Sequence, residues 1–155
     1  VLDPKQFTMR TGGRTFDAAA FLRRSGADTG EVKKLFQNDL EGTISRYNII
    51  QNARMYKAGI AVAKVDHTIG RVTAAQAADE LLNISGIEAS FVLFPDGERV
   101  ILSARSMGDI NVQVILEKLG GGGNAATAGA QVANPSVDAV FKQLLQAIDQ
   151  YLSDE

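Results

Sequence analysis

One stretch of the chain reads Gly120-Gly121-Gly122-Gly123-Asn124-Ala125-Ala126-Thr127-Ala128-Gly129. The preceding residues, 111–119, have apolar side chains at helical spacing, and the residues that follow are small and apolar, unlike a flexible linker. Glycines between packed segments let backbone N–H groups approach a ligand that any Cβ would block, and successive N–H groups form an anion-binding concavity. The stretch therefore predicts a site for a phosphate or a nucleotide.

An arginine lies one helix upstream of the glycines, in Ser103-Ala104-Arg105-Ser106 at the end of a predicted strand. Its guanidinium can bind a phosphate through two hydrogen bonds, and the hydroxyls of Ser103 and Ser106 can add donors. Alone, this arginine would be read as an ordinary surface residue. The glycine run nearby favours an anion ligand instead.

The glycines and Asn124 have separate interpretations. Gly120 fits the position that closes the preceding helix, where a left-handed backbone is common. Gly121, Gly122 and Gly123 are not needed for that cap, so we interpret them as places of close ligand approach. For Asn124 the sequence leaves two roles open: a hydrogen bond to a phosphate or base edge, or a cap of the next turn.

Composition narrows the class of protein. The 155 residues are 45% hydrophobic and 22% charged with a net charge of −2, which is typical of a globular chain and argues against coating of nucleic acid. The α/β class is predicted from the helical and strand periodicities along the chain. No apolar run approaches the roughly 20 residues of a membrane helix. The absence of cysteine excludes disulfides, and His67, the single histidine, is expected in an exposed loop without a ligand role. A histidine-rich metal centre and a Ser-His-Asp triad are therefore excluded.

Periodicity and capping signals predict the order of elements. A long helix runs from a capping box at Asp28 and Glu31 to about residue 53, and a buried strand covers 59–65. Thr73 is expected to cap a helix over 74–84. The runs 91–94 and 100–102 form a hairpin around Asp96-Gly97. We expect Asp109 to cap the helix before the glycines, and Asn134, ahead of Pro135, to begin the last helix.

The first residues suggest a fragment. Val1-Leu2-Asp3 reads as the end of a buried strand, without an initiator methionine or a signal peptide. Asp3 is a candidate metal ligand at that strand end. In the loop that follows, Arg10 and Arg14 flank two glycines and are candidate anion ligands.

Two sets of residues resemble the DHH phosphoesterase family. Ser103–Ser106, a helix, and then Gly121–Gly129 resemble the DHH-associated domain, whose signature GGGHxxAAG is kept in spacing while Asn124 replaces the histidine. Residues 3–16 resemble the end of the catalytic DHH domain. Within the family, the sequence segments around "SARS-GDINVQ" and "LGGGG" most resemble those of the membrane-anchored cyclic-di-AMP phosphodiesterases.

This resemblance implies an organisation. Residues 1–28 would be the C-terminal end of the catalytic domain, 29–55 a linker helix, and 56–155 a DHH-associated, substrate-binding domain with a mixed β-sheet flanked by helices. It also implies two-metal hydrolysis with manganese, in which Asp3 is the last metal ligand and the other ligands precede residue 1. Arg105 and Gly121–Gly123 would hold the substrate, while the chain alone would bind no manganese and be inactive. Pro4 stands where the family usually has threonine.

Partners and location follow from the same resemblance. The expected substrate is a cyclic dinucleotide, bound by a cytoplasmic portion of a protein anchored in the bacterial inner membrane. One alternative is a nucleic-acid module that binds short oligonucleotides, as in DHH-type exonucleases, although few aromatic residues are available for stacking. Another is a homodimerisation module that uses the long helix and the last helix.

Overall fold

The computed structural model describes residues 29–154, with side chains from residue 40 onward. The chain divides into two compact units, residues 1–43 and residues 44–155, and the sheet with its packed helices belongs to the second. Helix α2 (Thr29–Gln51) spans the division, and it confirms the long helix predicted for this segment.

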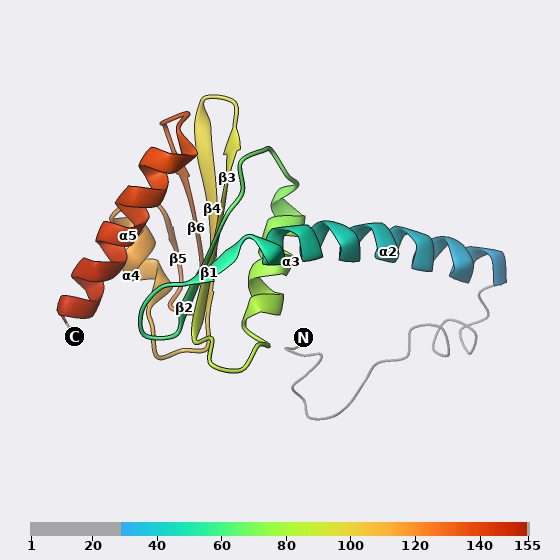
Figure 1. The fold of residues 1–155 in the computed structure, drawn as a ribbon, viewed down its shortest axis with the longest axis horizontal. Coiled ribbons are helices and arrows are strands. Elements are labelled where there is room, and N and C mark those ends of the chain that lie inside the picture. Colours follow the sequence, from blue (N-terminus) through green and yellow to red (C-terminus); the bar gives the residue numbers. More distant parts are fainter. Residues whose placement is uncertain (1–28, 155) are drawn as a thin grey trace. The chain divides into compact units, whose positions relative to one another are not determined.

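A six-stranded mixed sheet forms the centre of the second unit (Figure 1). Strands β2 and β3 are parallel, and every other neighbouring pair is antiparallel. The structure thus confirms the predicted α/β class and mixed sheet. In spatial order, the strands are β1 (Ala53–Met55), β2 (Ile60–Lys64), β3 (Ala89–Asp96), β4 (Arg99–Ser106), β6 (Thr127–Val132) and β5 (Gly122–Gly123).

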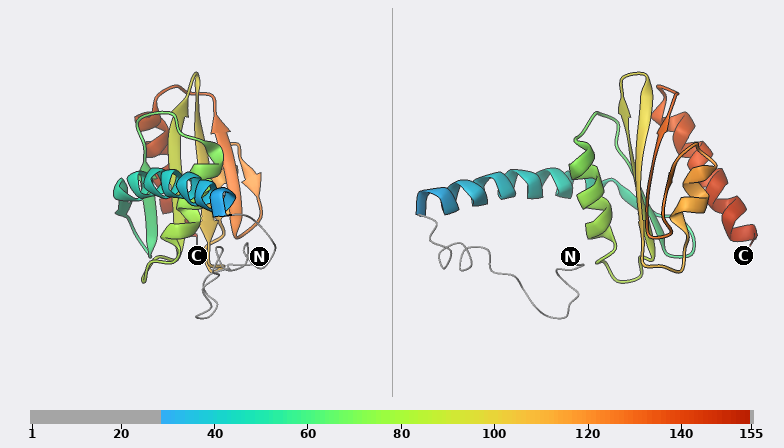
Figure 2. Two further views of the ribbon diagram at one scale, coloured as in Figure 1. Left: turned by 90° about the vertical axis from the view of Figure 1, so that its right-hand side faces the viewer. Right: turned by 180° about the vertical axis from the view of Figure 1, so that it is seen from behind.

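Helices lie on both faces of this sheet (Figure 2). Successive strand residues point to opposite faces, so the apolar side chains of the strands enter two separate cores. One core packs against α4 (Val112–Glu117) and α5 (Val137–Ser153), and includes Phe91, Leu93 and Leu102. The other packs against α3 (Arg71–Leu81), and includes Val92 and Phe94.

The helical cover of the sheet is uneven. On its own face, α3 contacts β3 and β4. Beyond β4 on that face, Gly122, Thr127 and Gln131 of β5 and β6 are exposed. The opposite face of β6 is covered by α4, and Ala128 and Ala130 are buried there. One face of the β4–β6–β5 part of the sheet is therefore open.

The β3–β4 hairpin confirms the prediction around Asp96-Gly97. Asp96 pairs with Arg99, and Gly97 has φ of +65°, a left-handed conformation that suits the first central position of a two-residue hairpin turn. However, β4 runs to Ser106, four residues beyond the predicted end at Leu102. Its last part pairs with β6, and such long-range pairing cannot be read from local sequence.

The predicted start of α3 is wrong. The helix begins at Arg71, not at Ala74, and Thr73 lies in its first turn. Gly70 is the N-cap and provides no side-chain cap. Its extended backbone places its carbonyl so that the N–H of Ala74 donates to it over 2.9 Å.

The capping residues of α4 and α5 also differ from those predicted. Asn111, not Asp109, caps α4, and its side chain accepts from the N–H of Val114. Ser136, not Asn134, caps α5 by accepting from the N–H of Ala139. Several residues before each helix have side chains able to cap, and the path of the loop selects the one that does so.

Candidate functional site

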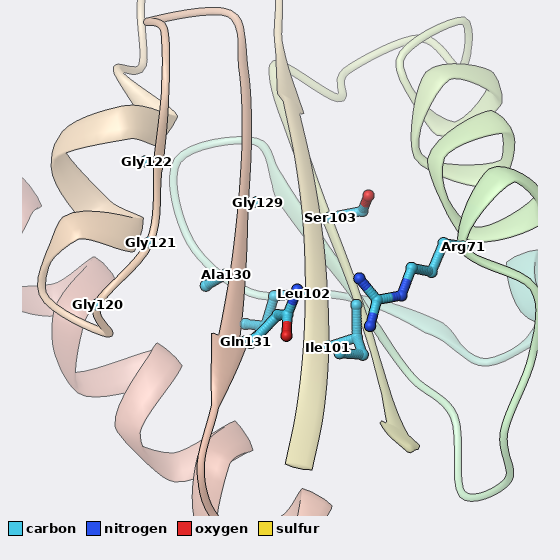
Figure 3. A pocket seen from close by; sticks show the side chains of 10 residues that line it. All are labelled: Arg71, Ile101, Leu102, Ser103, Gly120, Gly121, Gly122, Gly129, Ala130 and Gln131. Atoms are coloured by element: carbon cyan, nitrogen blue, oxygen red, sulfur yellow. The ribbon is translucent and has the colours of Figure 1, made fainter.

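A hollow of about 480 Å³ opens beside the uncovered part of the sheet (Figure 3). Its lining combines the segment after α4, two strands and one arginine from α3, so glycines and side chains far apart in sequence meet here. The lining residues are Arg71, Ile101, Leu102, Ser103, Gly120, Gly121, Gly122, Gly129, Ala130 and Gln131.

The open face carries a row of small residues across three strands. Gly129 of β6 pairs with Ser103 of β4 on one side and with Gly122 of β5 on the other. Directly paired residues project from the same face of a sheet. The row Ser103–Gly129–Gly122, which we call the strip, therefore presents mostly backbone, and a ligand can approach it closely.

The glycines of the run serve different purposes. Gly120 lies two residues after Lys118, the C-cap of α4, and has φ of +83°. Its N–H donates to Glu117 O, and the N–H of Gly121 donates to Leu116 O. This is the Schellman pattern, and it confirms the predicted cap. A Cβ on Gly121 would lie 2.3 Å from Gly129 O, and one on Gly123 would lie 2.3 Å from Thr127 O. These two glycines are thus required by close packing of β5 on β6.

Gly122 differs from its two neighbours. A Cβ on Gly122 would meet nothing within 4 Å, so nothing in the described chain requires a glycine here. Its φ is outside the left-handed region, and the residue is exposed on the strip. Of the three glycines interpreted as places of ligand approach, Gly122 is the one whose open surroundings support that interpretation.

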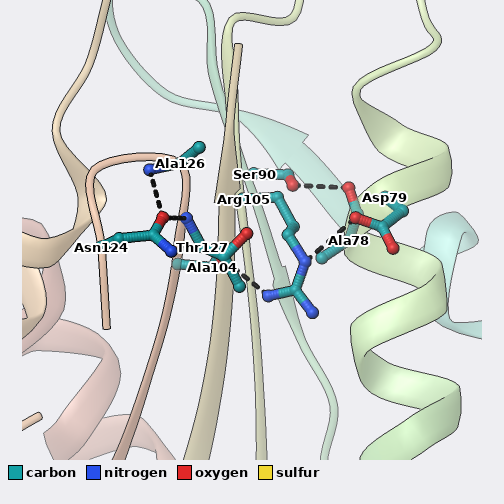
Figure 4. A network of polar contacts seen from close by, with 8 residues as sticks. All are labelled: Ala78, Asp79, Ser90, Ala104, Arg105, Asn124, Ala126 and Thr127. Carbon is teal, nitrogen blue, oxygen red and sulfur yellow. Dashed lines mark hydrogen bonds and ion pairs between the residues drawn. The ribbon is translucent and has the colours of Figure 1, made fainter. Parts of the chain in front are cut away.

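Arg105 projects from β4 on the same face as Ser103 and pairs with Thr127 of β6. Its Nε donates to Asp79 Oδ1 of α3 over 3.0 Å, and its Nη1 donates to Ala104 O over 2.8 Å (Figure 4). Only 17% of the side chain is exposed. The guanidinium is therefore oriented from two sides, while Nη2 has no partner among the described residues.

Asn124 closes the turn between β5 and β6. Its Oδ1 accepts from the N–H groups of Ala126 and Thr127, both over 2.9 Å (Figure 4). The backbone N–H of Asn124 donates to Thr127 O. Of the two roles left open by the sequence, the structure shows the cap. The side-chain NH₂ has no partner within the described chain.

The two serines of the Ser103–Ser106 segment are separated by the sheet. Ser106 lies on the opposite face from Arg105, as alternation along β4 requires. It is 6% exposed, and its Oγ accepts from the N–H of Gly108. Ser103 is beside the hollow, whereas Ser106 supports a turn, so Ser106 is not brought together with the other predicted ligands.

Two polar side chains that line the hollow were missed by the sequence reasoning. Arg71 extends from α3 over the sheet toward Ile101 (Figure 3). Gln131 stands opposite Ile101 in the β4–β6 ladder, and its Oε1 accepts from Arg99 Nη1 over 2.7 Å. The alternation of Thr127, Gly129 and Gln131 could have shown that these residues share one face of β6. Nothing in the local sequence indicated that β6 pairs with β4.

The remaining predicted ligands lie outside the described residues, namely Asp3, Arg10 and Arg14. Among the described residues, no three His, Asp or Glu side chains are grouped as metal ligands would be, so this part of the chain does not supply the implied manganese site. None of the described helices is long and apolar enough to cross a membrane.

The shifted pKa values belong to exposed clusters that do not line the hollow. Hydrogen bonds from Lys57 and Tyr56 lower the pKa of Asp149 and tie the turn after β1 to α5. A hydrogen bond from His67 lowers the pKa of Asp66 in the loop before α3, where the two groups are 3.1 Å apart.

Comparison with known proteins identifies the family. The DHHA1 domain model matches residues 57–154. The cyclic-di-AMP phosphodiesterase PdeA of Listeria monocytogenes is 45% identical over 100% of this chain and 24% of its own length. The cyclic-di-AMP phosphodiesterase GdpP of Geobacillus thermodenitrificans is 47% identical over 97% of this chain and 23% of its own length. The chain thus spans about a quarter of these relatives.

A solved structure has the same fold. The exopolyphosphatase-related protein from Bacteroides fragilis superposes with a TM-score of 0.64 at 20% identity, covering 86% of this chain and 42% of that one. At this identity the likeness concerns the fold alone. The domain match over more than half of the chain shows that the chain belongs to the DHHA1 domain family.

Proposed function

We propose that this chain binds a small phosphorylated nucleotide, cyclic di-AMP in particular, and presents it to the catalytic domain of a longer phosphodiesterase. The observation that carries the proposal is the strip Ser103–Gly129–Gly122, a floor of backbone with Arg105 beside it. The names of the relatives PdeA and GdpP supply the class of substrate.

The residues have distinct roles in this proposal. The guanidinium of Arg105 binds a phosphate oxygen through Nη2, while Nε and one N–H of Nη1 hold the group in place. The Ser103 hydroxyl can donate a further hydrogen bond. Gly129 and Gly122 let the nucleotide lie against the sheet, where a larger side chain would hold it away. Positioning of this kind is a large part of catalysis when the reacting groups come from another domain.

The bond cleavage itself is assigned to the catalytic domain. The resemblance to the DHH family implies that the metal ligands come from that domain and that the chemistry is metal-assisted hydrolysis of a phosphodiester. We therefore propose that the 155-residue chain alone hydrolyses no cyclic di-AMP when manganese is added, whereas the longer protein does. Arg105→Ala in the longer protein should abolish most of the activity. Full activity in that variant would contradict the proposed role of Arg105.

Binding can be tested directly on the chain. We expect titration of ¹⁵N-labelled protein with cyclic di-AMP to shift the backbone amide signals of Ser103, Gly122 and Gly129. Arg105→Gln should weaken the binding, since about 1.5–3 kcal/mol is typical for a hydrogen bond to a charged group. Arg54→Gln is a matched control, because Arg54 lies on β1 and its Nη1 binds backbone carbonyls of Gln51 and Ala53.

The same titration distinguishes the nucleic-acid alternative. No aromatic side chain lines the hollow within the described residues, and stacking on aromatic rings is a main source of affinity for single strands. A short oligonucleotide that bound more tightly than cyclic di-AMP, with steep salt dependence, would favour a nucleic-acid module instead.

Self-association and location remain proposals. Leu40, Ile44 and Tyr47 of α2 are exposed at 59%, 52% and 59%, which supports a homodimer through this helix. Light scattering tests it, and a strictly monomeric chain would contradict it. We also propose that this portion is cytoplasmic and that the longer protein carries the membrane anchor.

A further inference from the structure

Arg71 stands apart from the predicted site residues and yet lines the hollow. It is the first residue of α3, 55% of its side chain is exposed, and its guanidinium extends over the sheet toward Ile101 (Figure 3). Arg105 projects from the same face of β4, four residues beyond Ile101. Along β4, the open face therefore carries one guanidinium near Ile101 and a second at Arg105.

The spacing of the two arginines follows from α3 running alongside β4. Four residues of a strand span about 13 Å, and the eight helical residues from Arg71 to Asp79 rise about 12 Å. Asp79 binds Arg105 at one end, so Arg71 comes level with Ile101 at the other. Ala75 lies between Arg71 and Asp79 on the same side of the helix, where its small side chain leaves the middle clear.

The charge of Arg71 is available to an anion. Its Nη2 is 3.7 Å from Asp96 Oδ2, and the two side chains are 55% and 46% exposed. Such an exposed pair is loosely held and screened by water. Arg99, another cation at this end, donates from Nη1 to Gln131 Oε1 over 2.7 Å and is not among the residues that line the hollow.

We propose that Arg71 is a second phosphate contact and that the open face binds a ligand with two phosphate groups, one on each side of Ser103 along β4. This inference rests on the proposed function and adds the basis of selectivity. A dinucleotide engages Arg71 and Arg105 together, whereas a mononucleotide has a single phosphate and occupies only the Arg105 end. Two charge-assisted contacts on one rigid ligand then favour dinucleotides.

The test measures dissociation constants of cyclic di-AMP and AMP for the full 155-residue chain at constant ionic strength. We expect Arg71→Gln to raise the dissociation constant of cyclic di-AMP about tenfold and to change that of AMP less than twofold. Arg105→Gln should weaken the binding of both ligands, and Arg54→Gln should weaken the binding of neither. The amide signals of Ile101 and Gln131 should shift with cyclic di-AMP and not with AMP. Thermal unfolding of each variant verifies that the fold is intact.

The outcomes separate this inference from the proposed function. If Arg71→Gln bound cyclic di-AMP like the wild type while Arg105→Gln did not, the second contact would be refuted and the proposed function would stand. Equal weakening of both ligands by Arg71→Gln would refute the two-ended site. If the wild type bound neither ligand, the proposed function would fail, and this inference with it.

Discussion

Arg105 of β4 and Asp79 of α3 are joined by an ion pair in which Nε donates to Oδ1 over 3.0 Å. The arginine side chain is 17% exposed and the aspartate 61% exposed. The pair connects the strand that carries the candidate phosphate ligand to the helix that borders the hollow. Asp79 is therefore a positioning residue, because it sets the direction in which Arg105 presents its remaining N–H donors.

Substitution of Asp79 should leave the Arg105 side chain in place but less well oriented. We expect Asp79→Ala to weaken binding of cyclic di-AMP about three- to tenfold, since a hydrogen bond contributes about 0.5–1.5 kcal/mol. Asp79→Asn keeps an acceptor oxygen and should recover most of the affinity. Isothermal titration checks both variants. If Asn and Ala had the same effect, orientation by this hydrogen bond would be excluded as the role of Asp79.

Two neighbouring glycines of the run, Gly121 and Gly122, should respond differently to alanine. Gly121→Ala places a Cβ against the backbone of β6 and should destabilise the fold by about 1–3 kcal/mol, as overpacking does. Gly122→Ala has open space and should leave the melting temperature unchanged while it weakens nucleotide binding. Thermal unfolding and titration together separate packing from ligand approach. A large loss of stability in Gly122→Ala would show that the strip is structural.

Asn124 offers a test of its cap. Asn124→Ala loses two hydrogen bonds to the backbone of the β5–β6 turn and should cost about 1 kcal/mol of unfolding free energy. Asn124→Asp keeps the accepting oxygen and should retain stability, but its negative charge should oppose a phosphate nearby. Urea unfolding measures the first effect and titration the second. Unchanged affinity in Asn124→Asp would place the phosphate away from this turn.

The cluster around Asp149 predicts a pH dependence of stability. Hydrogen bonds from Lys57 and Tyr56 hold the pKa of Asp149 below its ordinary value of 3.8. The unfolded chain therefore takes up the proton first as pH falls. This contribution is fully present above pH 3.8 and is lost as the pH falls through the lowered pKa of the folded state. Asp149→Asn should thus destabilise the protein at neutral pH and have progressively less effect as the pH falls below 3.8.

Unfolding curves of the wild type and Asp149→Asn across this range check the sign. The Tyr56 hydroxyl has a raised pKa for the same reason, mainly its hydrogen bond to Asp149. Its contribution is complete below the ordinary value of 10.0 and disappears at higher pH. If the free energies of unfolding of the wild type and Asp149→Asn differed by the same amount from pH 2 to pH 7, the proposed link between Asp149 ionisation and stability would be contradicted.

Much of the architecture could be predicted because its signals are local. The apolar spacing of α4 and α5, the Asp96-Gly97 turn and the cap at Gly120 each depend on a few neighbouring residues. Helix starts were less accurate, because Thr73, Asp109 and Asn134 can all cap, and the loop path selects Gly70, Asn111 and Ser136 instead. The site was predicted in part: Arg105 and Gly122 face the open side, whereas Ser106 does not.

The sequence by itself determined the family, the order of the helices and of strands β2, β3 and β4, and the presence of an arginine and a glycine run in one domain, whereas β1, β5 and β6 were not predicted. Only the tertiary structure decided which face of the sheet each residue occupies and which face is open. The physical reason is that side-chain alternation along a strand is local, while register and helix cover are set by pairing with distant segments. For that reason Gly121 and Gly123 belong to packing, Gly122 to the strip, and Arg71 to a site in which local sequence did not place it.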